Sequence, residues 1–542
     1  MTDPEAASWN PPPANTPASV STARPPTDAL PLMLTLALTV LAYLLTRGAA
    51  GTLGLNVLLI VAALLGTLLT VLYRRGQSVN RAALVLLGLG SLCALGLTLR
   101  DGPLMDGLNL LGLFTALGLG IAHLRVPGLT RLSVGQMLLV ALWNGLRVAS
   151  ELLASALRFP WARLRAGGLT RHFHTEQSRR VLTGLLLTLP LLLVFGALLG
   201  GADARFGQLI ARLFRWTLPA WNTGELAFTF LQLVFWAFLL GGPVYAGLLA
   251  TRAAPDAQVA HTPRLGLTEL GLPLLSTSLL FCTYLTVQAS NFFGTRLPGG
   301  LTYSQAAWQG FGALTAVATL TLVVLLLAHT LLRRELRTGL PYRLLSGAVL
   351  LPLTLLIVSA YQRLALYVAA YGLSEIRVLG TVFLAWVTLS LLTYSVLLWR
   401  GGLERFAYFS LISGLGLIVG LNGVNPGRLI ATVNLNRMLE AAPATSFDST
   451  RAATNQGTLV EVADLGPDAL PVLLAHLNAR GSLSVRVKDD ALMCALARNN
   501  RPEFSDWRLW NLARRSATQL MSDLEGRFPL PLWEECRVSY DD

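Results

Sequence analysis

The chain has 542 residues, of which 53% are apolar and only 13% are charged, and its mean hydropathy is +0.56. Soluble domains carry roughly 25% charged residues, so this composition excludes an ordinary soluble protein and indicates a membrane protein. The net charge of +13 does not indicate a nucleic-acid partner, because residues 1–422 hold 29 Arg against 14 acids (+15) and residues 423–542 hold 13 basic residues against 15 acids (−2).

The chain begins with residues 1–29, where seven Pro stand among Ala, Ser and Thr and predict a disordered tail. Apolar stretches long enough to span a bilayer, or nearly so, then follow. They form a first group of four within residues 30–122 and a second group of seven within residues 181–422. The eleven stretches are 30–46, 53–73, 82–99, 103–122, 181–199, 227–250, 266–288, 307–332, 345–367, 379–399 and 404–422.

An arginine-rich loop, residues 123–180, separates the two groups and contains a twelfth apolar stretch at 133–159. Asn144, Arg147 and Glu151 argue against a span here, since a charge at the bilayer centre costs roughly 2.5–3.5 kcal/mol on insertion scales. We predict an amphipathic helix that lies on the inner leaflet. If this stretch did span, every later loop would change sides.

The arginines predict the orientation of the spans. With the N-terminus inside, the cytoplasmic segments hold 21 Arg and the opposite side of residues 1–422 holds 8. Because cytoplasmic loops are enriched in Arg and Lys, this distribution places the N-terminus in the cytoplasm. An odd number of spans then places residues 423–542 outside the cytoplasm.

Residues 423–542 are expected to form a small, mainly helical soluble domain. The stretches 468–477, 489–499 and 506–524 show apolar residues at helical spacing after plausible caps. Cys494 and Cys536 are the two cysteines of this region. In an oxidising space they are candidates for a disulfide, and two unpaired thiols are the alternative. The fold class is therefore an all-α bundle of about eleven spans with an appended helical domain.

Polar residues gather at the expected outer level of several spans. Arg363 lies about 19 residues into its span, or roughly 28 Å along the axis, close to the outer edge of a hydrocarbon core of about 30 Å. One interpretation is an Arg that reaches the headgroups beside an aromatic belt. The other is a shared pocket in which Arg363 binds a carboxylate or phosphate. The candidate ligand-binding residues are Arg363, Tyr361, Tyr367, Tyr371, Gln288, Asn291, Tyr303, Gln309 and Arg428.

Catalytic and metal-binding motifs are not found in the sequence. His172 and His174 in "RHFHTE" have no further ligand near them in sequence, so a solvated loop is favoured over a metal site. No GxSxG, HExxH or P-loop occurs. We therefore assign no catalytic residue, no metal and no cofactor. Enzymatic activity is left uncertain and disfavoured.

Four stretches give the chain a resemblance to a known family: "TYSQAAWQGFGALTAVATLTL", "YQRLALYVAAYGLSEIRV", "NPGRLIATVNLNR" and "LGPDALPVLLAHL". They resemble, in order, the signatures of the bacterial membrane family known as domain of unknown function 4153/4173, over roughly residues 175–525. Gln305 and Gln309 depart from the family pattern, which has an acidic and a basic residue near the start of that helix. The resemblance implies a multi-pass protein of the bacterial inner membrane with a helical tail, and it implies no activity.

Three functions remain open at this point. The first is a non-enzymatic sensor or binding protein of the cell envelope, whose partners are membrane lipids, including anionic headgroups, or an envelope protein that contacts residues 423–542. The second is a secondary transporter of a small anionic solute, although the later spans are largely apolar at mid-depth, where transporters place their sites. The third is a lipid- or envelope-modifying enzyme. The oligomeric state is not predicted.

Overall fold

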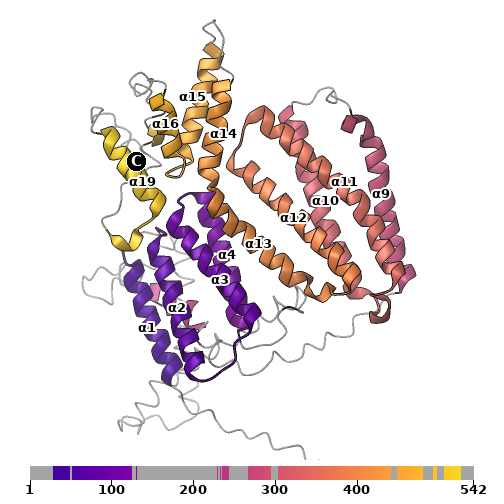
Figure 1. Ribbon diagram of the computed structural model, residues 1–542, viewed down its shortest axis with the longest axis horizontal. Coiled ribbons are helices and arrows are strands. Elements are labelled where there is room, and N and C mark those ends of the chain that lie inside the picture. Colours follow the sequence, from indigo (N-terminus) through magenta and orange to yellow (C-terminus); the bar gives the residue numbers. More distant parts are fainter. Residues whose placement is uncertain are drawn as a thin grey trace, which may run out of the picture.

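The computed structural model describes residues 29–48, 52–124, 130, helical residues within 229–244, 266–293, 303–440, 449–479, 492, 494–496 and 506–525. The elements within these ranges are helices (Figure 1). Several predicted features lie outside the described residues: nearly all of the tail at 1–29, the interfacial helix at 133–159 and the span at 181–199.

The first bundle contains four helices, and their bounds agree closely with the predicted spans. Each helix begins and ends where the apolar run does, and the N-cap Asn80 accepts a hydrogen bond from the backbone N–H of Ala82 to start the third. The helices are α1 (Ala29–Thr46), α2 (Leu55–Arg74), α3 (Arg81–Leu99) and α4 (Pro103–Ala122).

The second bundle is built from four longer helices, and a fifth helix joins it to the first. The helices extend past the predicted apolar stretches: α9 continues beyond residue 288 to Phe293, and α11 begins at Leu340 instead of 345 and continues beyond 367 to Tyr371. α11 ends at Gly372, whose φ of +77° suits a glycine. The five helices are α9 (Leu267–Phe293), α10 (Tyr303–Leu331), α11 (Leu340–Tyr371), α12 (Glu375–Arg400) and α13 (Phe406–Val424).

Seven described helices are long and apolar enough to cross a membrane, and α1 is a shorter apolar helix. Many of their large apolar side chains are exposed, Leu351 and Leu366 among them. Apolar side chains that face outward on such helices are what a lipid solvent requires. The chain is therefore a multi-pass helical membrane protein, as its composition predicts.

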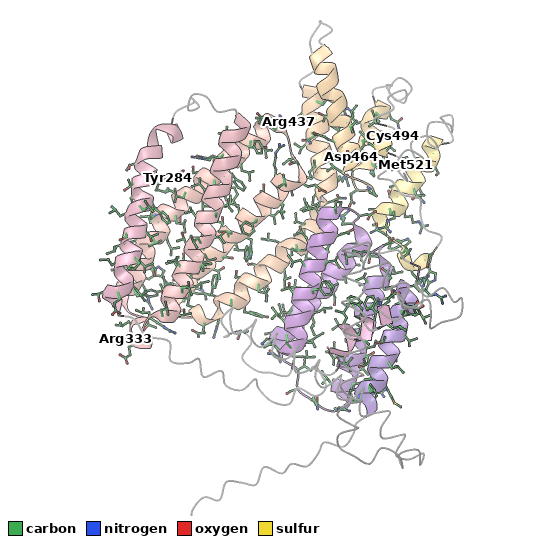
Figure 2. The ribbon with its side chains drawn as sticks, turned by 180° about the vertical axis from the view of Figure 1, so that it is seen from behind. Tyr284, Arg333, Arg437, Asp464, Cys494 and Met521 are labelled. Carbon is green, nitrogen blue, oxygen red and sulfur yellow. The ribbon has the colours of Figure 1, made fainter. Side chains whose placement is uncertain are left out.

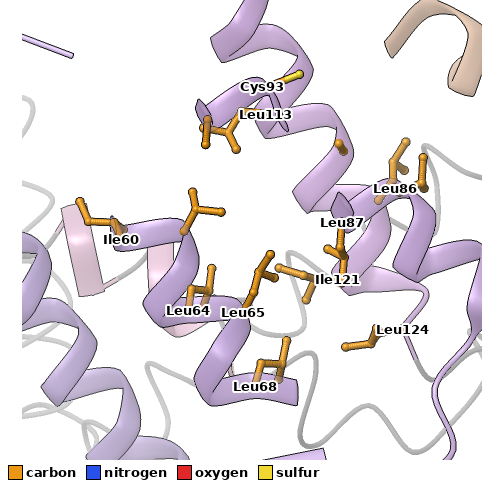
Figure 3. Packing of buried hydrophobic residues seen from close by; sticks show 14 of the residues in the cluster. Ile60, Leu64, Leu65, Leu68, Leu86, Leu87, Cys93, Leu113, Ile121 and Leu124 are labelled. Atoms are coloured by element: carbon orange, nitrogen blue, oxygen red, sulfur yellow. The ribbon is translucent and has the colours of Figure 1, made fainter. Parts of the chain in front are cut away.

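Each bundle has its own apolar core. In the first, Leu64, Leu68, Leu87 and Leu113 point between the helices (Figure 3), and in the second the buried side chains come from α9 to α12. The bridging helix α13 contributes to both cores, through Phe406 on one side and Leu415 on the other.

The chain ends in a third group of helices, called here the C-terminal helices, which have a separate core that includes Leu435, Leu459 and Leu473. They stand on one end of the spans, the upper end in Figure 1, where α1, α3, α11 and α13 end and α2, α4 and α12 begin. The group consists of α14 (Pro426–Glu440), α15 (Ser449–Asp464), α16 (Leu470–Ala479), the 3₁₀ turn η5 (Trp507–Leu509) and α19 (Leu512–Glu525).

Candidate functional site

Polar residues concentrate where the C-terminal helices meet the upper end of the first bundle. Asp468, which precedes α16, is at the centre of this contact and is only 9% exposed. Its Oδ1 accepts hydrogen bonds from Arg100 Nη1 at 3.3 Å and from Asn425 Nδ2 at 2.9 Å, and its Oδ2 accepts one from the backbone N–H of Asp101 at 3.1 Å. One carboxylate thus joins the α3–α4 turn, the α13–α14 turn and α16.

A second ion pair lies beside the first. Arg514, in α19, is 7% exposed, and it grips Asp101 in a bidentate pair, with Nε to Oδ2 at 3.0 Å and Nη2 to Oδ1 at 2.9 Å. Asn511 donates from Nδ2 to the carbonyl oxygens of Leu97 at 3.0 Å and Arg100 at 2.7 Å. These carbonyls close α3 and would otherwise lack partners. We call Arg100, Asp101, Asn425, Asp468, Asn511 and Arg514 the first joint.

The electrostatics of the first joint follow from its burial. Removal from water raises the pKa of Asp468 above its usual range, although the Asp101 N–H, Arg100 and Asn425 each act to lower it. Buried charges are expensive unless each is paired and hydrogen-bonded. Asp468 binds groups of the α3–α4 turn and the α13–α14 turn, and Arg514 binds Asp101 in the α3–α4 turn. The arrangement is therefore suited to holding these elements together.

A pair of asparagines lies deeper, between α4 and α13. Asn109 and Asn422 exchange two side-chain hydrogen bonds, at 2.9 and 2.8 Å. Gly96 makes room for them: a Cβ there would lie 2.5 Å from Asn422 Oδ1 and 2.6 Å from Asn109 Oδ1. Reciprocal amide bonds satisfy polar groups that lipid cannot, so this pair holds α13 against α3 and α4.

The C-terminal helices also contact the second bundle. Asn434, in α14, pairs with the backbone of Leu373, accepting from its N–H and donating to its carbonyl, both at 2.8 Å. Arg437 donates to the last carbonyls of α11, at 2.6 Å to Ala369 and 3.2 Å to Ala370. A guanidinium at a helix C-terminus is favourable to the helix dipole. We call Asn434, Arg437 and residues 368–373 the second joint (Figure 2 labels Arg437).

The structure brings together part of the site predicted from the sequence. Tyr367 and Tyr371 lie with ring centroids 5.3 Å apart, and Arg377 stacks over Tyr367 at 4.3 Å. Arg377 also donates to the carbonyl oxygens of Tyr371 and Gly372 at 3.0 and 2.7 Å. Its charge therefore stabilises the end of α11, and aromatic faces cover it.

The other predicted residues are dispersed. Arg363 is half-buried along α11, Tyr361 packs against the core of the second bundle, and Arg428 is exposed on α14. Cys494 is held in a disulfide, while Cys536 lies outside the described residues, so the pairing of these two stays a prediction. The structure does not describe the side chains of Gln288, Asn291, Tyr303 and Gln309.

Asn425, Asn434 and Arg437 lie within the stretch "NPGRLIATVNLNR" that carries the family resemblance, but the sequence did not predict their partners. Asp101, Asp468 and Arg514 look like ordinary loop and helix-end charges in the sequence. Asn109 offered a better signal, because an amide inside an apolar span requires a partner in lipid. Among the described residues, no three His, Cys, Asp or Glu side chains lie close enough to hold a metal ion.

Comparison with known proteins gives one family. Residues 32–476 match the family described as a domain of unknown function, DUF4153. No curated protein and no solved structure matched the chain. The matched range runs from α1 through α16 and so includes Asp468 and most of both joints. The chain belongs to the DUF4153 family, which confirms the resemblance seen in the sequence.

Proposed function

We propose that this member of the DUF4153 family is a non-enzymatic sensor or binding protein of the bacterial inner membrane, with the C-terminal helices as its receptor face. The observation that carries the proposal is their attachment by two joints. The first joint ties them to α3 and α4, the second ties them to α11 and α12, and α14 follows α13 directly. A partner that shifts these helices would act on both bundles at once.

The proposed topology has about eleven spans, a cytoplasmic N-terminus and the C-terminal helices outside, as a soluble domain. The arginine pairs Arg74–Arg75 and Arg333–Arg334 stand at the C-terminal ends of α2 and α10. These helix ends are the lower ones in Figure 1, opposite the C-terminal helices, which supports this arrangement. Arg and Lys favour the cytoplasmic side. An envelope protein or an anionic headgroup would then reach the C-terminal helices from outside.

A sensor requires that a change in one joint alters the other. Hydrogen exchange of one backbone amide in each joint measures whether this happens. The Asp101 N–H is bound by Asp468 in the first joint and the Leu373 N–H by Asn434 in the second. We expect Asp468→Asn, measured by hydrogen exchange on the full chain in lipid, to speed exchange at both amides. We expect Asn434→Ala to do the same, since coupling between two sites is reciprocal.

Two features make that experiment decisive. Acceleration at Asp101 in Asp468→Asn shows that the first joint has opened, and Asp523→Asn, an exposed carboxylate on α19, serves as the matched control. If each substitution changes only its own joint, the C-terminal helices are a passive attachment and the sensor proposal fails.

A further inference from the structure

The turn that leads into α19 exposes two large apolar side chains. Trp507 is 63% exposed and Leu512 is 46% exposed. Trp507 begins the 3₁₀ turn η5 and Leu512 begins α19, which rises away from the spans (Figure 1). Exposed aromatic and aliphatic side chains on an otherwise polar surface indicate an interaction surface.

Backbone and side-chain contacts fix the level of this turn against the spans. Arg508, held by Asp506, donates from Nη1 to the carbonyl oxygen of Leu44 in the last turn of α1. The N–H of Leu55, the first residue of α2, donates to the carbonyl oxygen of Trp510 at 3.0 Å. Gly54 permits this approach, since a Cβ there would lie 2.8 Å from the same oxygen. The turn is therefore fastened to the ends of two membrane helices.

The turn lies next to the end of the exposed apolar face of α1. Met33, Leu36, Val40 and Leu44 are 66%, 66%, 46% and 51% exposed, and their spacing of three and four residues puts them on one face of the helix. This face ends at Leu44, whose carbonyl binds Arg508 next to Trp507. An apolar surface that runs the length of a span is the surface that lipid covers.

We propose that Trp507 and Leu512 lie in the headgroup region of the bilayer at the upper end, and that they anchor the C-terminal helices to lipid. Tryptophan suits this position because its ring is apolar and its indole N–H can bond to headgroups and water. The partner is the bilayer that contains α1 and α2, so the inference holds whichever side of the membrane the upper end faces.

The test measures depth with a nitroxide on the full chain in nanodiscs of phosphatidylethanolamine and phosphatidylglycerol. Labels are placed by Trp507→Cys and, in a second protein that keeps the tryptophan, by Leu512→Cys. The exposed Cys282 is first changed to Ser, and the disulfide of Cys494 is left oxidised. Collision rates with oxygen, which partitions into lipid, and with a water-soluble nickel chelate give the depth of each label.

Leu36→Cys on α1 and Ser522→Cys near the far end of α19 are the references, the latter ten residues or roughly 15 Å along the helix from Leu512. We expect oxygen-to-nickel ratios at Trp507 and Leu512 that lie between the references and exceed the Ser522 ratio several-fold. Ratios equal to that of Ser522 would show a site in water. Low rates with both reagents would show that protein covers the turn, and either result overturns the proposal.

Discussion

At the scale of single residues, the stability of the upper end depends on buried polar groups that satisfy one another. Asp468 accepts three hydrogen bonds, and Asn109 is fully buried with its amide paired to Asn422. The loss of one partner in such a network costs about 1–3 kcal/mol, because the remaining group stays buried without a bond. Small residues are therefore needed wherever a helix passes close to these groups.

Gly96 is the position where a small residue is needed most. We expect Gly96→Ala to lower the free energy of unfolding by about 1–3 kcal/mol, because the added Cβ would lie within 2.6 Å of both asparagine Oδ1 atoms. Gly88→Ala is the matched control on the same helix, since a Cβ there meets nothing within 4 Å. Thermal unfolding of both variants in mild detergent makes the comparison. Equal midpoints for the two variants would refute the role given to the asparagine pair.

At the scale of elements, the sequence predicts well what depends on neighbours in the chain. The bounds of α4, predicted as 103–122, follow from an apolar run that Pro103 opens. α11 continues to Tyr371, beyond the apolar stretch 345–367, because an apolar run marks the part of a helix that fits lipid and not the whole helix. Arg377 and Arg437 supply partners for its final carbonyls. The first joint was missed because Arg514 and Asp101 are 413 residues apart, and no local pattern links them.

Helix direction gives a prediction at the same scale. In a Cys282→Ser background, Ser522→Cys on α19 should react with a membrane-impermeant maleimide in intact cells. Glu335→Cys, exposed between α10 and α11 at the lower end, should react only after the inner membrane is opened. The physical reason is that each membrane crossing takes the chain to the other side. Two sites joined by an even number of crossings lie on the same side, and two sites joined by an odd number lie on opposite sides. The reverse labelling pattern would invert the proposed topology.

At the scale of the whole molecule, the C-terminal helices and α13 unite two bundles that have separate cores. The joints lie at the ends of helices that are long and apolar enough to span a membrane. In the proposed sensor, a small rotation of α14 or α16 would displace both bundles. Interfaces that repack between discrete arrangements are the usual means of such transmission. The anchor formed by Trp507 and Leu512 would make the same helices responsive to the bilayer.

The most direct test measures one distance between the C-terminal helices and the second bundle. Spin labels at Asp523→Cys on α19 and Leu366→Cys on α11, both exposed sites, are read by pulsed electron resonance in nanodiscs. The account predicts one narrow distance distribution, which broadens when Asn434→Ala and Arg437→Ala open the second joint. The matched control is the double variant Arg428→Ala with Asn436→Ala, which alters two exposed residues of α14. The account predicts no broadening of the distance distribution in this control. A broad distribution in the unaltered protein, or one that the joint variant leaves unchanged, would contradict the claim that the C-terminal helices are held to both bundles.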